Sequence, residues 1–75
     1  MIETLPKLVE NSFGIAWDYL AATGELGDPD IAARHLLDTI ETMARQGERR
    51  RLLLANKAII AYQRFRAEQE LSLAS

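Results

Sequence analysis

The chain has 75 residues, no cysteine and a net charge of −2, which together describe one small domain, residues 1–75, without disulfides or thiolate metal sites. Its longest uninterrupted apolar run, Ala58–Tyr62, is far short of the ~20 residues that a membrane-spanning helix needs. Met1–Lys7 contains an acid and a proline where a secretory signal would be basic and then apolar. We therefore expect a cytoplasmic protein that does not span a membrane.

Charge is distributed unevenly along the chain. Residues 1–46 carry three basic and eight acidic side chains, whereas residues 47–75 carry six basic and three acidic ones. This asymmetry predicts that the acidic part packs against the basic part, within one chain or between two. The alternative interpretation is a basic helix that faces a polyanion.

The first predicted helix covers residues 5–23. Pro6 suits its first turn, because the first N–H groups of a helix have no partner within the helix. Gly24 lies where a residue in the left-handed conformation commonly ends a helix. One side of this helix is apolar at helical spacing and is predicted to face the core: Leu5, Leu8, Val9, Phe13, Ala16, Trp17 and Leu20.

The clearest linker, residues 24–29, leads into a second predicted helix over residues 29–46. The carboxylate of Asp28 is expected to accept hydrogen bonds from the free N–H groups at the start of this helix, with Pro29 at the first position. The outer face carries opposite charges four residues apart: Asp30/Arg34, Arg34/Asp38 and Glu41/Arg45. Gly47 ends the helix, and the short turn predicts a nearly antiparallel hairpin. A helix unbroken through Gly47 is the alternative.

The third predicted helix, residues 48–68, contains no glycine or proline. Apolar residues fill half of its circumference, which is wider than the ~100° stripe of an ordinary surface helix and suits a helix held by two neighbours. That half contains Leu52, Leu54, Ala55, Ala58, Ile59, Ala61, Tyr62 and Phe65. Leu53, Ile60 and Ala67 lie outside it, seven residues apart and between polar rows. Residues 69–75 are expected to form a frayed tail.

These patterns predict an all-α fold. The three helices, about 5–23, 29–46 and 48–68, form a three-helix bundle or a hairpin with the first helix laid across it, and the bundle is expected to assemble as a dimer. The predicted core consists of Leu8, Phe13, Ala16, Trp17, Leu20, Leu36, Leu37, Ile40, Met43, Leu54, Ala58, Ile59, Ala61, Tyr62 and Phe65.

Side chains with catalytic or metal-binding chemistry are few. No nucleophile elbow, phosphate loop or zinc protease helix is present, and one histidine offers little choice of general base. Asp28-Pro29-Asp30 begins like a calcium loop, but Ala32 and Ala33 follow where oxygen ligands are needed. His35 and Asp38 lie one turn apart, yet the predicted core has no further metal ligands, so His35 is interpreted as a surface residue. We predict no enzyme, no catalytic residue, no metal and no cofactor.

Basic residues on the third helix support an alternative function, a small nucleic-acid-binding or regulatory protein. The candidate contacts are Arg49, Arg50, Arg51, Lys57 and Arg64. The order of helices is that of a helix-turn-helix, but the expected turn is too short and Leu53 and Ile60 would face the groove. Three arginines at a helix N-terminus also oppose its dipole, which indicates an acidic neighbour such as Glu41 or Glu48, or a bound anion.

The seven-residue row Leu53, Ile60 and Ala67 favours an interaction or assembly module. An aliphatic row flanked by polar side chains is typical of a helix–helix seam. A two-fold dimer would bury this row and enlarge a core that 75 residues barely fill. We therefore expect a homodimer, or a complex with another helical protein. In the alternative, the first helix covers the row within the monomer.

The aromatic residues offer a third hypothesis, a carrier of a small apolar molecule. Its binding site would lie near Trp17, Tyr62 and Phe65. A domain of this size has little room for a ligand-sized cleft. Aromatic residues on the apolar face of a helix also usually belong to the core, so this hypothesis is the weakest of the three.

Overall fold

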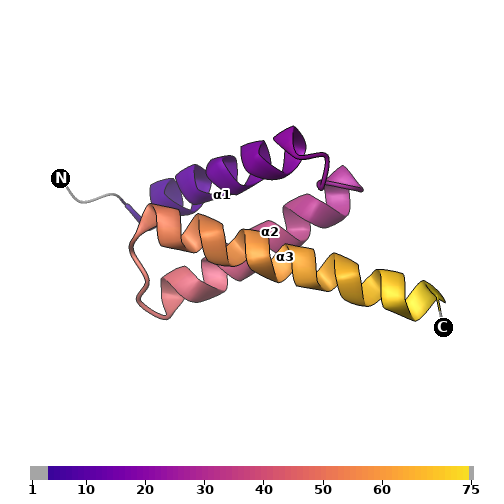
Figure 1. The fold of residues 1–75 in the computed structure, drawn as a ribbon. Coiled ribbons are helices and arrows are strands. Elements are labelled where there is room, and N and C mark those ends of the chain that lie inside the picture. The colour runs from indigo at the N-terminus through magenta and orange to yellow at the C-terminus, as the bar shows by residue number, and fades with distance from the viewer. Residues whose placement is uncertain (1–3, 75) are drawn as a thin grey trace.

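The structure, a computed structural model, describes residues 4–74 and is built from three helices (Figure 1). They are α1 (Leu5–Ala22), α2 (Pro29–Arg45) and α3 (Arg51–Ala74). Each helix contacts both of the others. The predicted all-α, three-helix fold is therefore confirmed.

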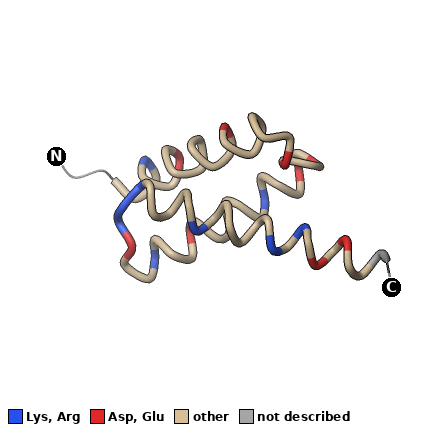
Figure 2. Tube along the Cα trace, in the orientation of Figure 1, with Lys and Arg blue, Asp and Glu red and all other residues tan. Residues whose placement is uncertain are grey.

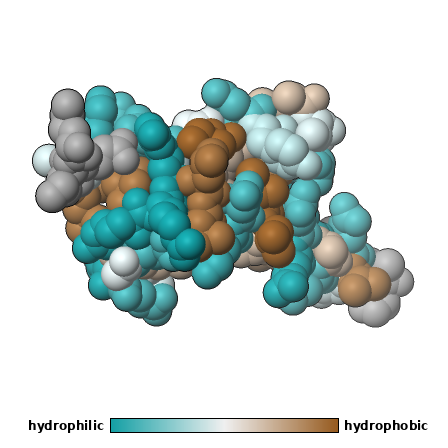
Figure 3. All heavy atoms as spheres, turned by 60° about the vertical axis from the view of Figure 1, so that its left-hand side comes forward, coloured by the Kyte–Doolittle hydropathy of each residue, from teal (hydrophilic) through white to brown (hydrophobic). Residues whose placement is uncertain are grey.

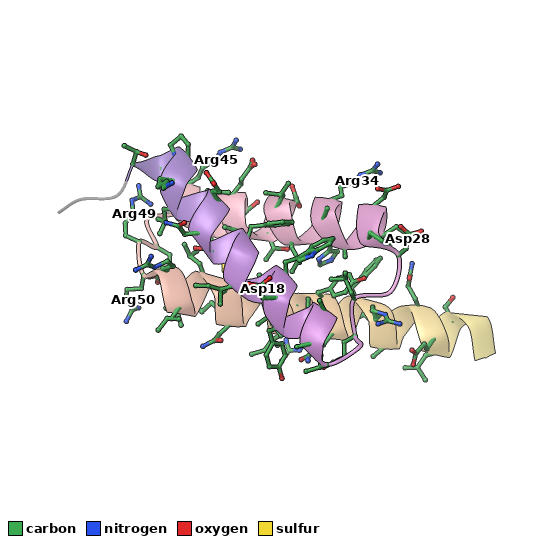
Figure 4. The ribbon with its side chains drawn as sticks, turned by 90° about the horizontal axis from the view of Figure 1, so that it is seen from above. Asp18, Asp28, Arg34, Arg45, Arg49 and Arg50 are labelled. Carbon is green, nitrogen blue, oxygen red and sulfur yellow. The ribbon has the colours of Figure 1, made fainter. Side chains whose placement is uncertain are left out.

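The arrangement is a hairpin with a helix across it. Helices α2 and α3 run in opposite directions, and α1 crosses them obliquely (Figures 1 and 4). Because α1 starts beside the end of α2 and finishes over the middle of α3, its buried residues lie where all three helices meet.

Local signals place the ends of α1 and α2 close to the predicted positions. Gly24 has a φ of 73°, and the N–H of Glu25 donates to the carbonyl oxygen of Leu20 at 2.8 Å, which closes α1 in a left-handed turn. At the start of α2, one carboxylate oxygen of Asp28 accepts from the N–H groups of Asp30 at 2.9 Å and Ile31 at 3.3 Å. The predicted capping role of Asp28 is confirmed.

The connection between α2 and α3 is longer than expected. Gly47 has a φ of 109°, and the N–H of Glu48 donates to Met43 O at 3.2 Å, so the two helices are separate. The predicted start of the third helix at residue 48 is wrong: α3 begins at Arg51, and Leu54 N–H donates to Arg50 O at 3.0 Å. A glycine in this conformation turns the chain, and the residues that follow must cross to the new helix before its first turn forms.

Side chains of α3 hold the linker between α1 and α2 in place. The Tyr62 hydroxyl donates to the carbonyl oxygen of Leu26, and the Arg66 guanidinium donates to that of Glu25. The Gln63 amide donates to the Glu25 carboxylate at 2.9 Å. Buried carbonyl groups need such partners, so one turn of α3 satisfies the backbone of a linker that precedes it by almost half the chain.

Small residues allow the helices to approach closely. The large buried side chains include Leu8, Leu20, Leu36, Ile40, Leu54 and Tyr62, as predicted. Between them lie fully buried small residues: Ser12, Ala16, Ala32, Ala44, Ala55 and Ala58. Four of these, Ser12, Ala32, Ala44 and Ala55, are missing from the predicted core, because large side chains dominate any estimate of buried area from sequence. The Ser12 hydroxyl is satisfied by Leu8 O at 2.8 Å.

Two leucines predicted to face the interior are exposed instead. Leu37 is 37% exposed and lines a hollow between α1 and α2, so its assignment to the core is wrong. Leu52 is 67% exposed, because it lies in the first turn of α3 at the edge of the apolar half. The neighbouring helices therefore cover a narrower arc of α3 than the sequence predicted.

Helix α3 also continues past its predicted end. Its predicted last residue was Glu68, but the helix extends to Ala74. No glycine or proline interrupts this stretch, and glutamate, glutamine, leucine and alanine all favour a helix. That this end frays in solution stays a prediction.

Two adjacent leucines provide a matched test of this packing. Leu36 is fully buried, whereas Leu37 is 37% exposed. We expect Leu36→Ala to lower the free energy of unfolding by about 2–5 kcal/mol through lost burial and a cavity, and Leu37→Ala to lower it by less than about 1 kcal/mol. Chemical denaturation monitored by circular dichroism measures both values. Equal losses would contradict the assignment of the two faces of α2.

Candidate interaction surface

The side of α3 opposite its buried face carries the predicted aliphatic row. Ile60 is 48% exposed and Ala67 is also exposed. Leu71, four residues after Ala67, lies on the same side of the helix and is 72% exposed. We call Leu53, Ile60, Ala67 and Leu71 the α3 row. Neither α1 nor α2 covers its central and C-terminal members.

Leu53, the first member of the row, is less exposed than predicted. It is half-buried, although it lies opposite the centre of the buried face. The connection before α3 lies close to Lys57, one turn after Leu53, because Met43, Glu48 and Lys57 line one common hollow. The structure therefore supports Ile60 and Ala67 as surface residues and Leu53 only in part.

The end of α3 projects beyond the other two helices (Figure 1). All side chains from Ala67 to Ser72 are exposed. Leu71 continues the row at a spacing of four residues from Ala67, but it lies beyond Glu68, the last residue of the helix that the sequence predicts. Ala67 and Glu70 border a hollow that they share with Gly24 and Glu25 of the α1–α2 linker, but neither α1 nor α2 packs over this segment, so it is available to a second molecule.

Apolar surface elsewhere is divided. Figure 3 shows apolar side chains in separate strips between hydrophilic ones on one face of the molecule. A hollow of about 490 Å³ between α1 and α2 is lined by Leu5, Pro6, Val9, Phe13, Leu37 and Ala44, with Glu10, Glu41 and Arg45 also along it. A second hollow of about 470 Å³ lies between α2 and α3. Neither hollow is lined by a residue of the α3 row.

Basic side chains gather at the end of the molecule where α2 joins α3 (Figures 2 and 4). Arg49 donates to the carbonyl oxygens of Ala44 and Glu48, which places a cation at the C-terminal end of α2. Such a charge favours the helix dipole and satisfies a carbonyl that has no partner within the helix. Arg49 therefore has a structural role.

Glu48 resolves the predicted conflict between the arginines and the start of α3. Its carboxylate accepts from the backbone N–H of Arg50 at 2.9 Å and from Arg50 Nε at 3.0 Å. The guanidinium of Arg50 and then its backbone N–H lower the pKa of Glu48 from 4.5 to about 2. The same contact raises the pKa of Arg50. Of the two predicted acidic neighbours, Glu48 is confirmed, whereas Glu41 pairs with Arg45 at 3.6 Å.

The five candidate nucleic-acid contacts do not form one group. Arg49 and Arg50 have the partners described above, and Arg51 also takes part in an interaction. Lys57 and Arg64 are exposed further along α3. Only these last two extend a basic surface along the helix. The connection of α2 and α3 is longer than expected, however, so the predicted short turn no longer argues against a helix-turn-helix arrangement.

His35 is not a simple surface residue, so that interpretation is wrong. Its ring lies 4.6 Å from that of Phe65 and 5.6 Å from that of Tyr62, measured between centroids. Its Nδ1 atom is buried and has no hydrogen-bond partner among the described residues. Because Tyr62 and Phe65 of α3 face α2, the histidine ring packs against them at the edge of the core.

The rings proposed as a small-molecule site fall into two groups. Trp17 stacks on Phe13 with centroids 5.4 Å apart, whereas Tyr62 and Phe65 pack with His35. Tyr62 is 2% exposed and its hydroxyl is bonded to the linker. These roles are structural and explain the rings without a ligand.

Glu48 gives a pH test of the arginine end. Because its folded pKa of about 2 lies below the ordinary value of 4.5, its contacts stabilise the fold above about pH 4.5 and lose this effect as the pH falls toward about 2. We expect the stability difference between wild type and Glu48→Gln to shrink across that interval. Carboxyl NMR titration should also show the Glu48 pKa returning toward 4.5 in Arg50→Gln. A Glu48 pKa that is the same in both proteins would contradict the contact.

Within residues 4–74, no group of three or more histidine, cysteine or acidic side chains is placed to hold a metal ion. No helix in this part of the chain combines the length and apolarity needed to cross a membrane. No known protein family, curated protein or solved structure matches the chain. The exposed side of α3 is therefore the feature of the structure that bears on function.

Proposed function

We propose that the protein is a small helical assembly module that forms a homodimer through the α3 row. The observation that carries this proposal is the exposure of Ile60 and Leu71, 48% and 72%, on the side of α3 that its own bundle leaves bare. Isolated exposed aliphatic residues are common on proteins. Here they recur at helical spacing on one side of a helix that projects past its neighbours, which is the pattern of a helix–helix contact.

The size of the domain also supports a partner. A chain of this length buries only about 60% of the surface that it exposes when unfolded. Pairing two α3 helices would add a second buried side to the longest helix. A second copy of the chain is always present at the same concentration. In a two-fold dimer the α3 row of one copy contacts the α3 row of the other.

The test is the oligomeric mass of variants in the row and outside it. Ile60→Glu should convert the dimer to a monomer at tens of micromolar. Each Ile60 is 48% exposed, so the two copies together lose about 1.5–3 kcal/mol of apolar burial, which raises Kd at least about tenfold. Gln69→Glu adds the same charge on the opposite side of the helix and should leave the dimer intact. Sedimentation equilibrium and circular dichroism report mass and helicity.

Two results would contradict homodimerisation through this row. The first is a wild-type protein that sediments as a monomer at these concentrations. The second is an Ile60→Glu variant that is folded and sediments as wild type does.

Nucleic-acid binding is the second candidate function. The observation that favours it is the exposure of Lys57 and Arg64 on one flank of α3. In mobility-shift assays with mixed duplexes and single strands at about 50 mM salt, we expect salt-dependent binding, with the logarithmic slope falling by about two in the double variant Lys57→Glu/Arg64→Glu. Arg34→Glu on α2 is the matched control. Absent binding, or binding that salt does not change, would rule out these phosphate contacts.

A further inference from the structure

We propose that the two copies pair with their α3 helices antiparallel, with the two-fold axis beside Ile60, so that Glu68 and Glu70 of each copy lie against the Arg49–Arg50 end of the other. This inference rests on the proposed function, because it assigns the orientation and the contacting residues of the same surface. In this arrangement a second copy of the chain covers the exposed side of α3.

Charge along α3 supports this orientation. The helix begins at an arginine-rich end and finishes with Glu68 and Glu70, both exposed on the projecting segment (Figures 1 and 2). Arg50 is bonded to Glu48, yet its side chain remains 77% exposed. Arg49 is exposed as well, although it donates to Ala44 O. The two ends of α3 are therefore complementary in charge to each other.

The spacing of these residues also fits. Glu70 and Arg50 each lie ten positions from Ile60, in opposite directions along the chain. At a rise of about 1.5 Å per residue, each is about 15 Å from Ile60 along the helix axis. With Ile60 facing Ile60, the projecting end of one copy reaches the arginine end of the other. In the same register Leu53 faces Ala67, a large residue against a small one.

A parallel pair would place like charges together. Each arginine-rich end would lie beside its counterpart, and Glu68 and Glu70 would face the same acids of the second copy. The helix dipoles would also be aligned side by side, with positive ends adjacent. The antiparallel pair avoids these contacts and brings opposite ends of the dipoles together.

The antiparallel register brings like charges together at two places related by the two-fold axis, and this repulsion makes the register testable. Lys57 and Arg64 lie on the same flank of the α3 row. Two-fold pairing about Ile60 brings Lys57 of one copy within about one turn of Arg64 of the other. Reversing one of these charges should therefore strengthen the dimer, although the change is made at its interface.

Disulfide trapping tests the orientation directly, since the chain has no cysteine of its own. Ile60→Cys should form a disulfide dimer under mild oxidation. A mixture of Leu53→Cys and Ala67→Cys should form the mixed disulfide, whereas each variant alone should remain mostly reduced. In the antiparallel register two copies of position 53 lie about 21 Å apart along the axis, far beyond the ~7 Å limit between bonded Cα atoms.

Each outcome of this experiment has one meaning. Mixed disulfides in preference to same-position disulfides at 53 or 67 support the antiparallel pair. Same-position disulfides there, in a protein that sediments as a dimer, would overturn the orientation while leaving the proposed function intact. A dimer that traps at none of these positions would overturn the α3 row as its interface, and a monomeric wild type would overturn the proposed function itself.

Charge reversal gives a second, independent readout. Arg64→Glu should lower the dimer Kd about three- to tenfold at low salt, because it replaces two repulsive contacts with two attractive ones. Glu68→Lys with Glu70→Lys should raise it by a similar factor. Gln69→Glu, on the opposite side of α3, is the control for negative charge added outside the α3 row and should leave the dimer Kd unchanged. A dimer that Arg64→Glu weakens or leaves unchanged would contradict the antiparallel register.

Discussion

The length of α3 relative to its neighbours is the constraint on which the rest of the structure depends. It has 24 residues, against 18 in α1 and 17 in α2, or about 36 Å against about 27 and 26 Å. Shorter helices cannot cover a longer one along its whole length. The first turns of α3 therefore belong to a three-helix core, while its last turns extend past α1 and α2, and the molecule reaches 48 Å along its longest axis. The projecting end of α3, with the exposed side chains from Glu68 to Ser72, follows from this mismatch.

Polar contacts at the two ends of the bundle stabilise it in different ways. At one end, Glu48 and Arg49 neutralise the ends of two successive helices, so an arginine-rich segment that would oppose the dipole of α3 instead joins α2 to it. At the other end, Tyr62 and Arg66 satisfy carbonyl groups of the α1–α2 linker. The first set lies in the connection just before α3, whereas the second is made by side chains of α3 itself.

Sequence was most informative where a local rule decides the structure. Helix order, the cap at Asp28 and the turns at Gly24 and Gly47 follow from residues that favour one backbone conformation.

The sequence was least informative where tertiary packing decides the structure. The buried alanines depend on how closely helices approach, and the positions of Leu37 and His35 depend on the rotation of α2 against two partners. The apolar pattern weakens after Phe65 and so predicts the end of the helix too early. In the structure α3 continues to Ala74, and the weaker pattern marks only the point past which α1 and α2 no longer cover it. For the candidate surface, periodicity predicts the exposure of Ile60 and Ala67, but it does not indicate that Leu53 is half-buried.

The hydrogen bonds from Tyr62 and Arg66 to the linker also have a consequence for the order of folding. They join residues 36 and 41 positions apart, whereas most contacts in a helical bundle are local. During synthesis, which proceeds from the N-terminus, the first two helices and the loop between them leave the ribosome before the residues that complete that loop. The nascent hairpin of α1 and α2 is accordingly an unfinished unit, and its linker is completed only after Tyr62 and Arg66 have been made.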